Sequence, residues 1–178
     1  MASNSQPTST DFTQLPSKDF GGSQIGRAAL AVAIRELKSG AKEIGGNNCG
    51  LWVKKYLDGL APEGSSWCAG FISYCFANSG FSMRFDYTVS ARDLLNQFRN
   101  KGWCYNPNEK LAPEPGDIVV WRRTKPNSWQ GHAGIVHHFH DGKLYTIEGN
   151  RSPKVDGFMY SYKGIKNILG LGRVPDIG

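Results

Sequence analysis

GHAGIVHHFHDGKLYTIEGN, residues 131–150, is the stretch of sequence that predicts the fold most strongly. Two apolar runs rich in β-branched and aromatic residues flank Asp141-Gly142, a pair typical of a tight turn between antiparallel strands. We therefore predict a β-hairpin with strands over 133–139 and 144–148.

The register of this hairpin decides whether His132 can meet an acidic side chain. A two-residue turn would place Glu148 opposite Ile135, on the face that points away from His132. A three-residue loop ending at Gly142 would instead place Glu148 opposite Gly134, on the same face as His132. Because glycine suits the left-handed third position of such a loop, we predict the three-residue loop and a neighbouring Glu148 and His132.

Helical patterns precede the hairpin and strand patterns surround it. Apolar spacing, caps and glycine stops predict helices over about 25–38, 51–57, 68–80 and 91–102. Shorter strands are predicted over 118–121, 158–162 and 169–174. Helices followed by an antiparallel sheet give an α+β fold. We predict one domain over 23–178, preceded by a disordered N-terminal tail over 1–22, which is rich in Ser, Thr and Pro.

Composition excludes several classes of protein. A chain of 178 residues with 39% hydrophobic residues can bury a core without disulfides or a structural metal. The longest apolar run, 28–34, is too short for a membrane span, and no secretory signal is recognisable, so we expect synthesis in the cytoplasm without a signal peptide. The net charge of +6 is spread out, with no basic stripe or nucleic-acid-binding module, so it indicates solubility or loose attraction to a polyanion and not a nucleic-acid-binding protein.

One of the four cysteines has a chemically distinctive position. Cys68 lies in the first turn of a predicted helix, where free N–H groups and the helix dipole favour the thiolate. Core packing is the alternative interpretation of Cys68. Cys75 follows seven residues later, about 10.5 Å along the same helix, which is too far for a disulfide. We expect mostly free thiols, with the state of Cys49, Cys75 and Cys104 left open.

The histidines do not form an evident metal site. His132 and His138 would lie about 20 Å apart on one strand and could not share an ion. His138 and His140 have only Asp141 as a nearby carboxylate, and no Asp-rich calcium loop occurs in the sequence. We therefore expect neither a metal nor a cofactor.

Four motifs together resemble a known family. They are SWCAGF at 66–71, PGDIV at 115–119, GHAGIV at 131–136 and IEGN at 147–150. In this order they resemble the CHAP domain (cysteine, histidine-dependent amidohydrolase/peptidase), a papain-like group of mostly bacterial and phage cell-wall hydrolases, over roughly residues 24–175. The resemblance implies a papain-like fold with its nucleophile at a helix N-terminus. It implies Cys68 as nucleophile, His132 as base, Glu148 as the residue that orients His132, and Asn150 as a supporting polar group.

The resemblance also implies a substrate. It predicts a peptidoglycan hydrolase that acts as an N-acetylmuramoyl-L-alanine amidase or as a stem or cross-bridge endopeptidase.

The backbone N–H of Cys68 would stabilise the oxyanion, and the Trp67 indole, Asn47 and Asn48 are candidates for a second donor. The candidate substrate-binding residues are aromatic: Trp67, Trp103, Tyr105, Trp121 and Trp129.

Two delivery routes and two rival functions remain open. The protein could be a phage endolysin released by lysis, or a toxin injected as an antibacterial effector, which would need secretion machinery and an immunity protein. Either would act on the cell wall or in the periplasm. The rivals are a papain-like amidase for a small non-wall amide and a catalytically silent wall-binding module, and the presence of Cys68, His132 and Glu148 together argues against the silent module.

Overall fold

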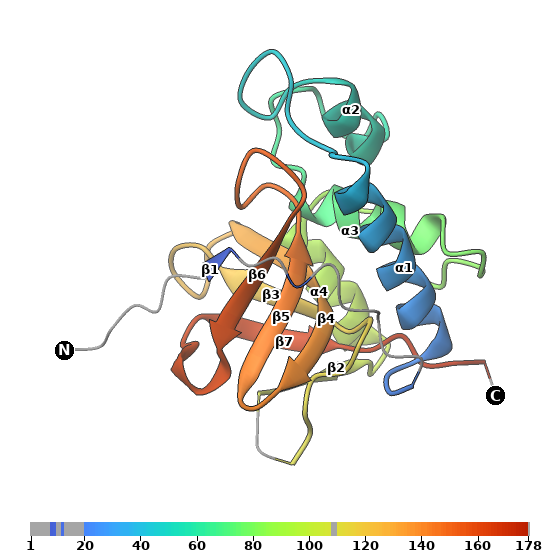
Figure 1. The fold of residues 1–178 in the computed structure, drawn as a ribbon, viewed down its shortest axis with the longest axis vertical. Coiled ribbons are helices and arrows are strands. Elements are labelled where there is room, and N and C mark those ends of the chain that lie inside the picture. The colour runs from blue at the N-terminus through green and yellow to red at the C-terminus, as the bar shows by residue number, and fades with distance from the viewer. Residues whose placement is uncertain (1–7, 10–11, 13–19, 108–109, 178) are drawn as a thin grey trace.

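Helices come first along the chain and most strands follow, as predicted. The computed structural model describes residues 8–9, 12, 20–107 and 110–177. The helices are α1 (Gln24–Lys38), α2 (Leu51–Leu57), α3 (Cys68–Ala77) and α4 (Ala91–Asn100), and a short 3₁₀ turn, η1, covers Tyr162–Gly164. In Figure 1, α1 and α3 lie side by side next to the sheet.

One antiparallel sheet gathers all the described strands. They are β1 (Thr8–Ser9), β2 (Cys104–Tyr105), β3 (Ile118–Arg122), β4 (Gly131–His140), β5 (Lys143–Glu148), β6 (Asp156–Ser161) and β7 (Ile168–Gly172). Their order across the sheet is β1-β6-β5-β4-β3-β7-β2, with β4 at the centre (Figure 1). The predicted α+β architecture is therefore confirmed.

Serine side chains cap the N-termini of α1 and α4 but not that of α3. Ser23 accepts a hydrogen bond of 2.9 Å from the Gly26 N–H at α1, and Ser90 accepts one of 3.1 Å from Asp93 at α4. Helix α3 instead follows Trp67, whose side chain makes no capping bond, although Ser65 and Ser66 stand just before it in the sequence. The first N–H groups of α3 are thus left without a side-chain cap at the end that carries Cys68.

Helix α3 is held firmly between its neighbours. Eight of its ten residues are buried, and it packs on α1, α2 and β4. A Cβ on Gly70 would lie 2.5 Å from the Tyr56 carbonyl oxygen, so glycine is required for this close approach of α2. Close packing on several sides fixes the position of the helix N-terminus relative to the sheet.

The hairpin turn differs from the prediction, but the predicted pairing of Glu148 still results. His140 pairs with Lys143, so the turn contains only Asp141 and Gly142, both with positive φ, which a tight hairpin turn of this kind requires. The three-residue loop was therefore wrong. The register then shifts by one residue between Val136 and His138, where β4 contains a β-bulge.

Beyond the bulge, the pairing follows the register that the three-residue loop would have given. Ile135 lies opposite Ile147, which brings Glu148 to the level of Gly134. A Cβ on Gly134 would lie 2.7 Å from Cγ of Glu148, so glycine leaves the space that the Glu148 side chain occupies. Glu148 consequently points to the His132 face of the sheet.

Only part of the predicted tail is described. Thr8–Ser9 pairs with β6, and Phe12 is 4% exposed and contacts the ring of His137 at 4.8 Å between centroids. Residues 1–7, 10–11 and 13–19 lie outside the described residues, so the tail and the domain boundary at residue 23 stay predictions. Within the described ranges, no helix is both long and apolar enough to span a membrane.

Candidate active site

Cys68 lies at the start of α3, facing the first residues of β4. Its side chain is buried, but it lines a cleft shared with residues of three loops. His132 and the backbone of Ala133 lie close enough to the thiol for hydrogen bonding to both to lower its pKa. The Ser66 hydroxyl lies 3.9 Å from Sγ. The predicted pairing of a helix-terminal cysteine with the strand histidine is thus present in the structure.

His132 connects this thiol to a buried carboxylate. Its Nε2 lies 2.6 Å from Oε1 of Glu148, and its ring lies 5.6 Å from that of Trp121. Nδ1 lies 3.1 Å from Nη2 of Arg123, which can only donate, so Nδ1 accepts in this arrangement. The proton of the neutral ring is then on Nε2 and is donated to Glu148.

Glu148 is fully buried and accepts hydrogen bonds on both oxygens. Oε1 is 2.6 Å from His132 and 2.6 Å from Nε of Arg151. Oε2 accepts from the Thr146 hydroxyl at 2.5 Å and from the Tyr160 hydroxyl at 2.7 Å. This set of donors stabilises the ionised carboxylate inside the protein.

The site perturbs the pKa values of all three groups. Burial raises the pKa of Cys68, but the hydrogen bond and charge of His132, with the charge of Arg123, outweigh it and lower the pKa from 9.0 to about 7. Burial lowers the pKa of His132, whereas its bonds to Cys68 and Glu148 raise it, and the net direction is upward. Burial raises the pKa of Glu148, but His132 and Arg151 lower it to about 2. Near neutral pH the site can therefore hold a thiolate beside an imidazolium.

This low thiol pKa gives a direct prediction for alkylation. The rate of carbamidomethylation of Cys68 by iodoacetamide should rise with pH and reach half its maximum near pH 7, because the thiolate is the reactive form. In His132→Ala the thiol loses the contact with His132 that lowers its pKa most, whereas burial still raises the pKa. The midpoint should therefore move up by about one pH unit or more. Peptide mass spectrometry at each pH measures both midpoints. Burial raises the pKa of Cys104, which makes it an internal control, and an equal midpoint at both cysteines would contradict the prediction.

The remaining predicted catalytic residue, Asn150, does not touch His132 with its side chain. Its amide donates to the Ser66 hydroxyl at 2.8 Å, and its backbone oxygen lies 3.5 Å from Nη2 of Arg123. Asn150 has φ of 67°, a left-handed conformation that asparagine tolerates better than most residues. It therefore links the loop after β5 to the residues that precede Cys68.

The four predicted tryptophans have different surroundings. Trp129 is 81% exposed and lines the Cys68 cleft, and Trp121 lines a second hollow beside His132. Trp67 is fully buried and stacks on Tyr56. Trp103 packs against Phe98 and lines neither hollow. The structure brings only Trp129 and Trp121 to these two hollows.

The candidates for the second oxyanion donor do not reach the thiol. The Trp67 indole N–H already donates to Glu43 at 3.0 Å. The Asn48 amide donates to the Gly64 carbonyl at 3.2 Å, and neither Asn47 nor Asn48 lines the Cys68 cleft. These three assignments are therefore not supported by the geometry.

Gly149 controls the position of Trp67 and thereby of Cys68. A Cβ at Gly149 would lie 2.4 Å from Cζ3 of the buried indole. Gly149→Ala should therefore displace the residue just before α3, lowering the free energy of unfolding by about 1–3 kcal/mol and reducing kcat. Gly170→Ala is the matched control, since its Cβ would meet only the two methyl groups of the Leu95 side chain, at 3.1 and 3.8 Å. Urea unfolding and turnover by both variants test this, and equal effects would contradict it.

Several residues around the site were not anticipated. Thr146 could have been found, because it lies two residues before Glu148 and alternation places both on one face. Tyr160 and Arg151 converge on Glu148 only through the fold. Arg123, at the end of β3, carries no sequence signal of its contact with His132. In the described part of the chain, no group of three or more His, Cys, Asp or Glu side chains could hold a metal ion.

Comparison with known proteins identifies the class. The CHAP domain profile matches residues 60–150, just over half of the chain, and the matched range contains all four residues of the predicted site. The chain belongs to the CHAP domain family, the cysteine, histidine-dependent amidohydrolases and peptidases. The α+β arrangement, with the cysteine at a helix N-terminus beside an antiparallel sheet, is confirmed. No curated protein matches the chain significantly.

Solved structures similar to the chain are distant in sequence. NlpC2 from Trichomonas vaginalis has a TM-score of 0.48 and 15% identity, covering 90% of this chain and 50% of that one. Ly7917 has a TM-score of 0.47 and 14% identity, covering 84% and 62%. Ly7917 with the hydrolyzing product of MDP has a TM-score of 0.41 and 15% identity, covering 85% and 63%. This chain thus spans about half to under two thirds of those chains.

Proposed function

We propose that this protein hydrolyses an amide bond of bacterial peptidoglycan, as an N-acetylmuramoyl-L-alanine amidase or as a stem or cross-bridge endopeptidase. The observation that carries the proposal is the continuous contact from Cys68 through His132 to the buried Glu148. The net charge of +6 also suits an anionic wall polymer. The exposed Trp129 at the Cys68 cleft offers an aromatic surface for a sugar or peptide.

In this proposal Cys68 is the nucleophile. Its thiolate attacks the amide carbonyl and forms a tetrahedral oxyanion, which the backbone N–H groups at the open start of α3 stabilise. His132, protonated on Nδ1, gives that proton to the leaving amine as the C–N bond breaks and a thioester forms. Water then attacks the thioester, His132 takes its proton, and the free carboxylic acid and thiol are released.

Glu148 acts through His132 and not on the substrate. Its carboxylate accepts a hydrogen bond from the Nε2–H and so keeps Nδ1 directed at Cys68. The negative charge also stabilises the imidazolium that pairs with the thiolate. Asn150 supports the same assembly by holding Ser66 beside the thiol.

Digestion of purified sacculi tests the proposal. Wild-type protein and Cys68→Ala are incubated with sacculi of several wall chemotypes, and the soluble products are identified by mass spectrometry. New muropeptides from the wild type alone are expected, and their masses and new amino termini distinguish an amidase from an endopeptidase. Release by both proteins would contradict Cys68 as nucleophile. Release by neither would contradict the wall substrate and favour the small-amide or silent-module alternative.

We propose that the protein reaches the wall from the cytoplasm, as an endolysin after host lysis or as a toxic effector delivered by a secretion machine. The two routes differ in their genetic neighbours. A holin gene nearby would support the endolysin, whereas a gene for a small inhibitor that binds the Cys68 cleft would support the effector with its immunity protein. Co-expression of such an inhibitor followed by the sacculus assay would test the second route.

A further inference from the structure

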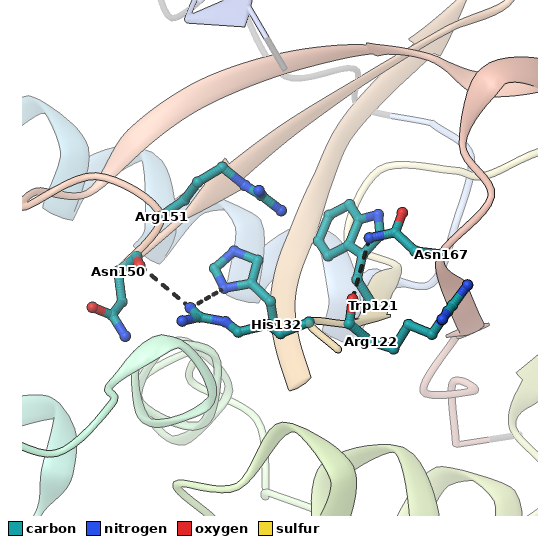
Figure 2. A pocket seen from close by; sticks show the side chains of 7 residues that line it. Trp121, Arg122, His132, Asn150, Arg151 and Asn167 are labelled. Atoms are coloured by element: carbon teal, nitrogen blue, oxygen red, sulfur yellow. Dashed lines mark hydrogen bonds between the residues drawn. The ribbon is translucent and has the colours of Figure 1, made fainter. Parts of the chain in front are cut away.

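A second hollow is lined by His132 and shares Arg123 with the cleft that Cys68 lines. It has a volume of about 370 Å³ and is lined by Trp121, Arg122, Arg123, His132, Asn150, Arg151 and Asn167. Figure 2 shows His132 near its middle, with Asn150 and Arg151 on one side and Trp121, Arg122 and Asn167 on the other. We call it the arginine hollow, because three of its seven lining residues are arginines and none is acidic.

The three arginines differ in whether a carboxylate already pairs with their positive charge. Arg151 is paired with Glu148 at 2.6 Å and lies over the ring of Trp121. Arg122 donates to the Thr124 carbonyl at 3.0 Å, and Arg123 contacts only His132 Nδ1 and the Asn150 carbonyl. Within the described ranges, neither Arg122 nor Arg123 forms an ion pair with a carboxylate. A cation that donates to a neutral imidazole has charge available for an anion.

A buried donor in the wall of the hollow also lacks a partner. The Trp121 side chain is 1% exposed, and its indole Nε1 has no hydrogen-bond partner among the described residues. A buried N–H without an acceptor destabilises the protein unless an acceptor binds there. The hollow therefore offers guanidinium charge that no carboxylate pairs, the chemistry that suits an anionic oxygen group, and the unpartnered Trp121 N–H belongs to a residue of its wall.

The position of the hollow indicates which part of a substrate it would meet. Cys68 lines the other cleft, His132 lines the arginine hollow, and Arg123 lines both. The thiol bonds to the acyl carbon, whereas the imidazole must reach the leaving nitrogen to protonate it. The residue that contributes the leaving amine therefore lies on the side of His132 and the arginine hollow.

We propose that the arginine hollow binds a carboxylate of the substrate on the leaving-amine side of the scissile bond, with Arg123 as its main ligand. The proposal rests on the proposed function and adds a requirement to it. The scissile amide must be followed by a residue that carries a free carboxylate, which fits the endopeptidase and not the amidase, because the L-alanine that an N-acetylmuramoyl-L-alanine amidase releases has its carboxyl in a peptide bond.

The contact between Arg123 and His132 links this binding to catalysis. Nη2 of Arg123 donates to Nδ1 of the neutral His132 ring, so the two groups must separate when Nδ1 takes up the proton of the Cys68 thiol. A carboxylate that draws the guanidinium into the hollow frees Nδ1 to accept this proton. A substrate with the carboxylate should thus gain in both binding and turnover.

The binding test uses one pair of ligands and the inactive Cys68→Ala protein. Soluble disaccharide-peptides from digested sacculi are titrated by calorimetry before and after their carboxylates are converted to carboxamides with carbodiimide and ammonium chloride. Amidation should weaken binding about tenfold or more, because a charge-assisted hydrogen bond is lost. In Cys68→Ala with Arg123→Gln, the two ligand forms should bind within about twofold of each other.

Lys125→Gln in the same Cys68→Ala background is the matched control. It removes one positive charge from the same loop but lines neither hollow, so the full preference for the carboxylate should remain. Equal binding of both ligand forms, or an unchanged preference in Arg123→Gln, would overturn the carboxylate site and leave the proposed function intact. No binding of either form, together with no release from sacculi, would overturn both.

Discussion

Cys68→Ser should lower kcat/KM on a soluble muropeptide by at least about four orders of magnitude, with the fold retained. The serine hydroxyl fits the space of the thiol, so its contact with His132 can persist. An alcohol is far less acidic than a thiol whose pKa is about 7, however, so almost no nucleophilic anion would form at neutral pH. Steady-state kinetics and thermal unfolding of the variant measure the two parts of this prediction.

Cys75→Ala provides the matched control for that loss. Cys75 lies on the same helix, is fully buried, and has its pKa raised well above the ordinary value by burial, so it is chemically inert. Its truncation leaves a small cavity and should lower the melting temperature while kcat/KM stays within about threefold below that temperature. A large loss of kcat/KM in Cys75→Ala with little loss in Cys68→Ser would reverse the assignment of the two thiols.

Glu148→Ala should have the largest effect on stability. It leaves the Arg151 charge and the hydroxyls of Thr146 and Tyr160 without their acceptor inside the protein. Breaking a buried pair of this kind should lower the free energy of unfolding by about 3 kcal/mol or more. Urea titration at neutral pH measures this change. Glu63→Ala removes an exposed acid paired with Lys54 and should change the unfolding free energy little.

Glu148→Gln separates the structural effect of Glu148 from its electrostatic effect. The amide retains the volume of the carboxylate but cannot stabilise an imidazolium, so kcat/KM should fall about a hundredfold or more. The folded protein lowers the pKa of Glu148 from 4.5 to about 2, so the unfolded chain binds this proton first as the pH falls. The stability that Glu148 contributes is therefore present above about pH 4.5 and lost towards pH 2. The stability difference between wild type and Glu148→Gln should shrink from pH 7 to pH 3, and a constant difference would contradict this account.

The sequence predicted the parts of the site that depend on local rules. A helix with Cys68 in its first turn and a strand beginning at His132 follow from spacing and turn residues. The four motifs that resembled the CHAP domain added the roles of these residues. The same local rules placed α4 correctly through the capping serine Ser90.

Other features depend on contacts that no local pattern encodes. The side chain of Arg123 reaches His132 only because β3 and β4 are paired in the sheet, with Arg122 opposite Gly131. The burial of Trp67 removes it from any role in binding, although its neighbour Cys68 lines a cleft. Aromatic residues suit both cores and binding surfaces, so composition alone could not distinguish Trp67 from Trp129.

The β-bulge at His137 lets one hairpin have both a two-residue turn and Glu148 on the same face as His132. A turn of two residues and a carboxylate on the histidine face are incompatible in a regular ladder, and one additional residue reconciles them. The tip over 138–145 can therefore evolve or be engineered in length as an independent module, provided that His137 stays unpaired. Deleting His137 alone would remove the bulge but keep Val136 opposite Thr146, so Glu148 should stay on the histidine face, whereas pairing His137 in a regular ladder would place Glu148 opposite Ile135 and away from His132.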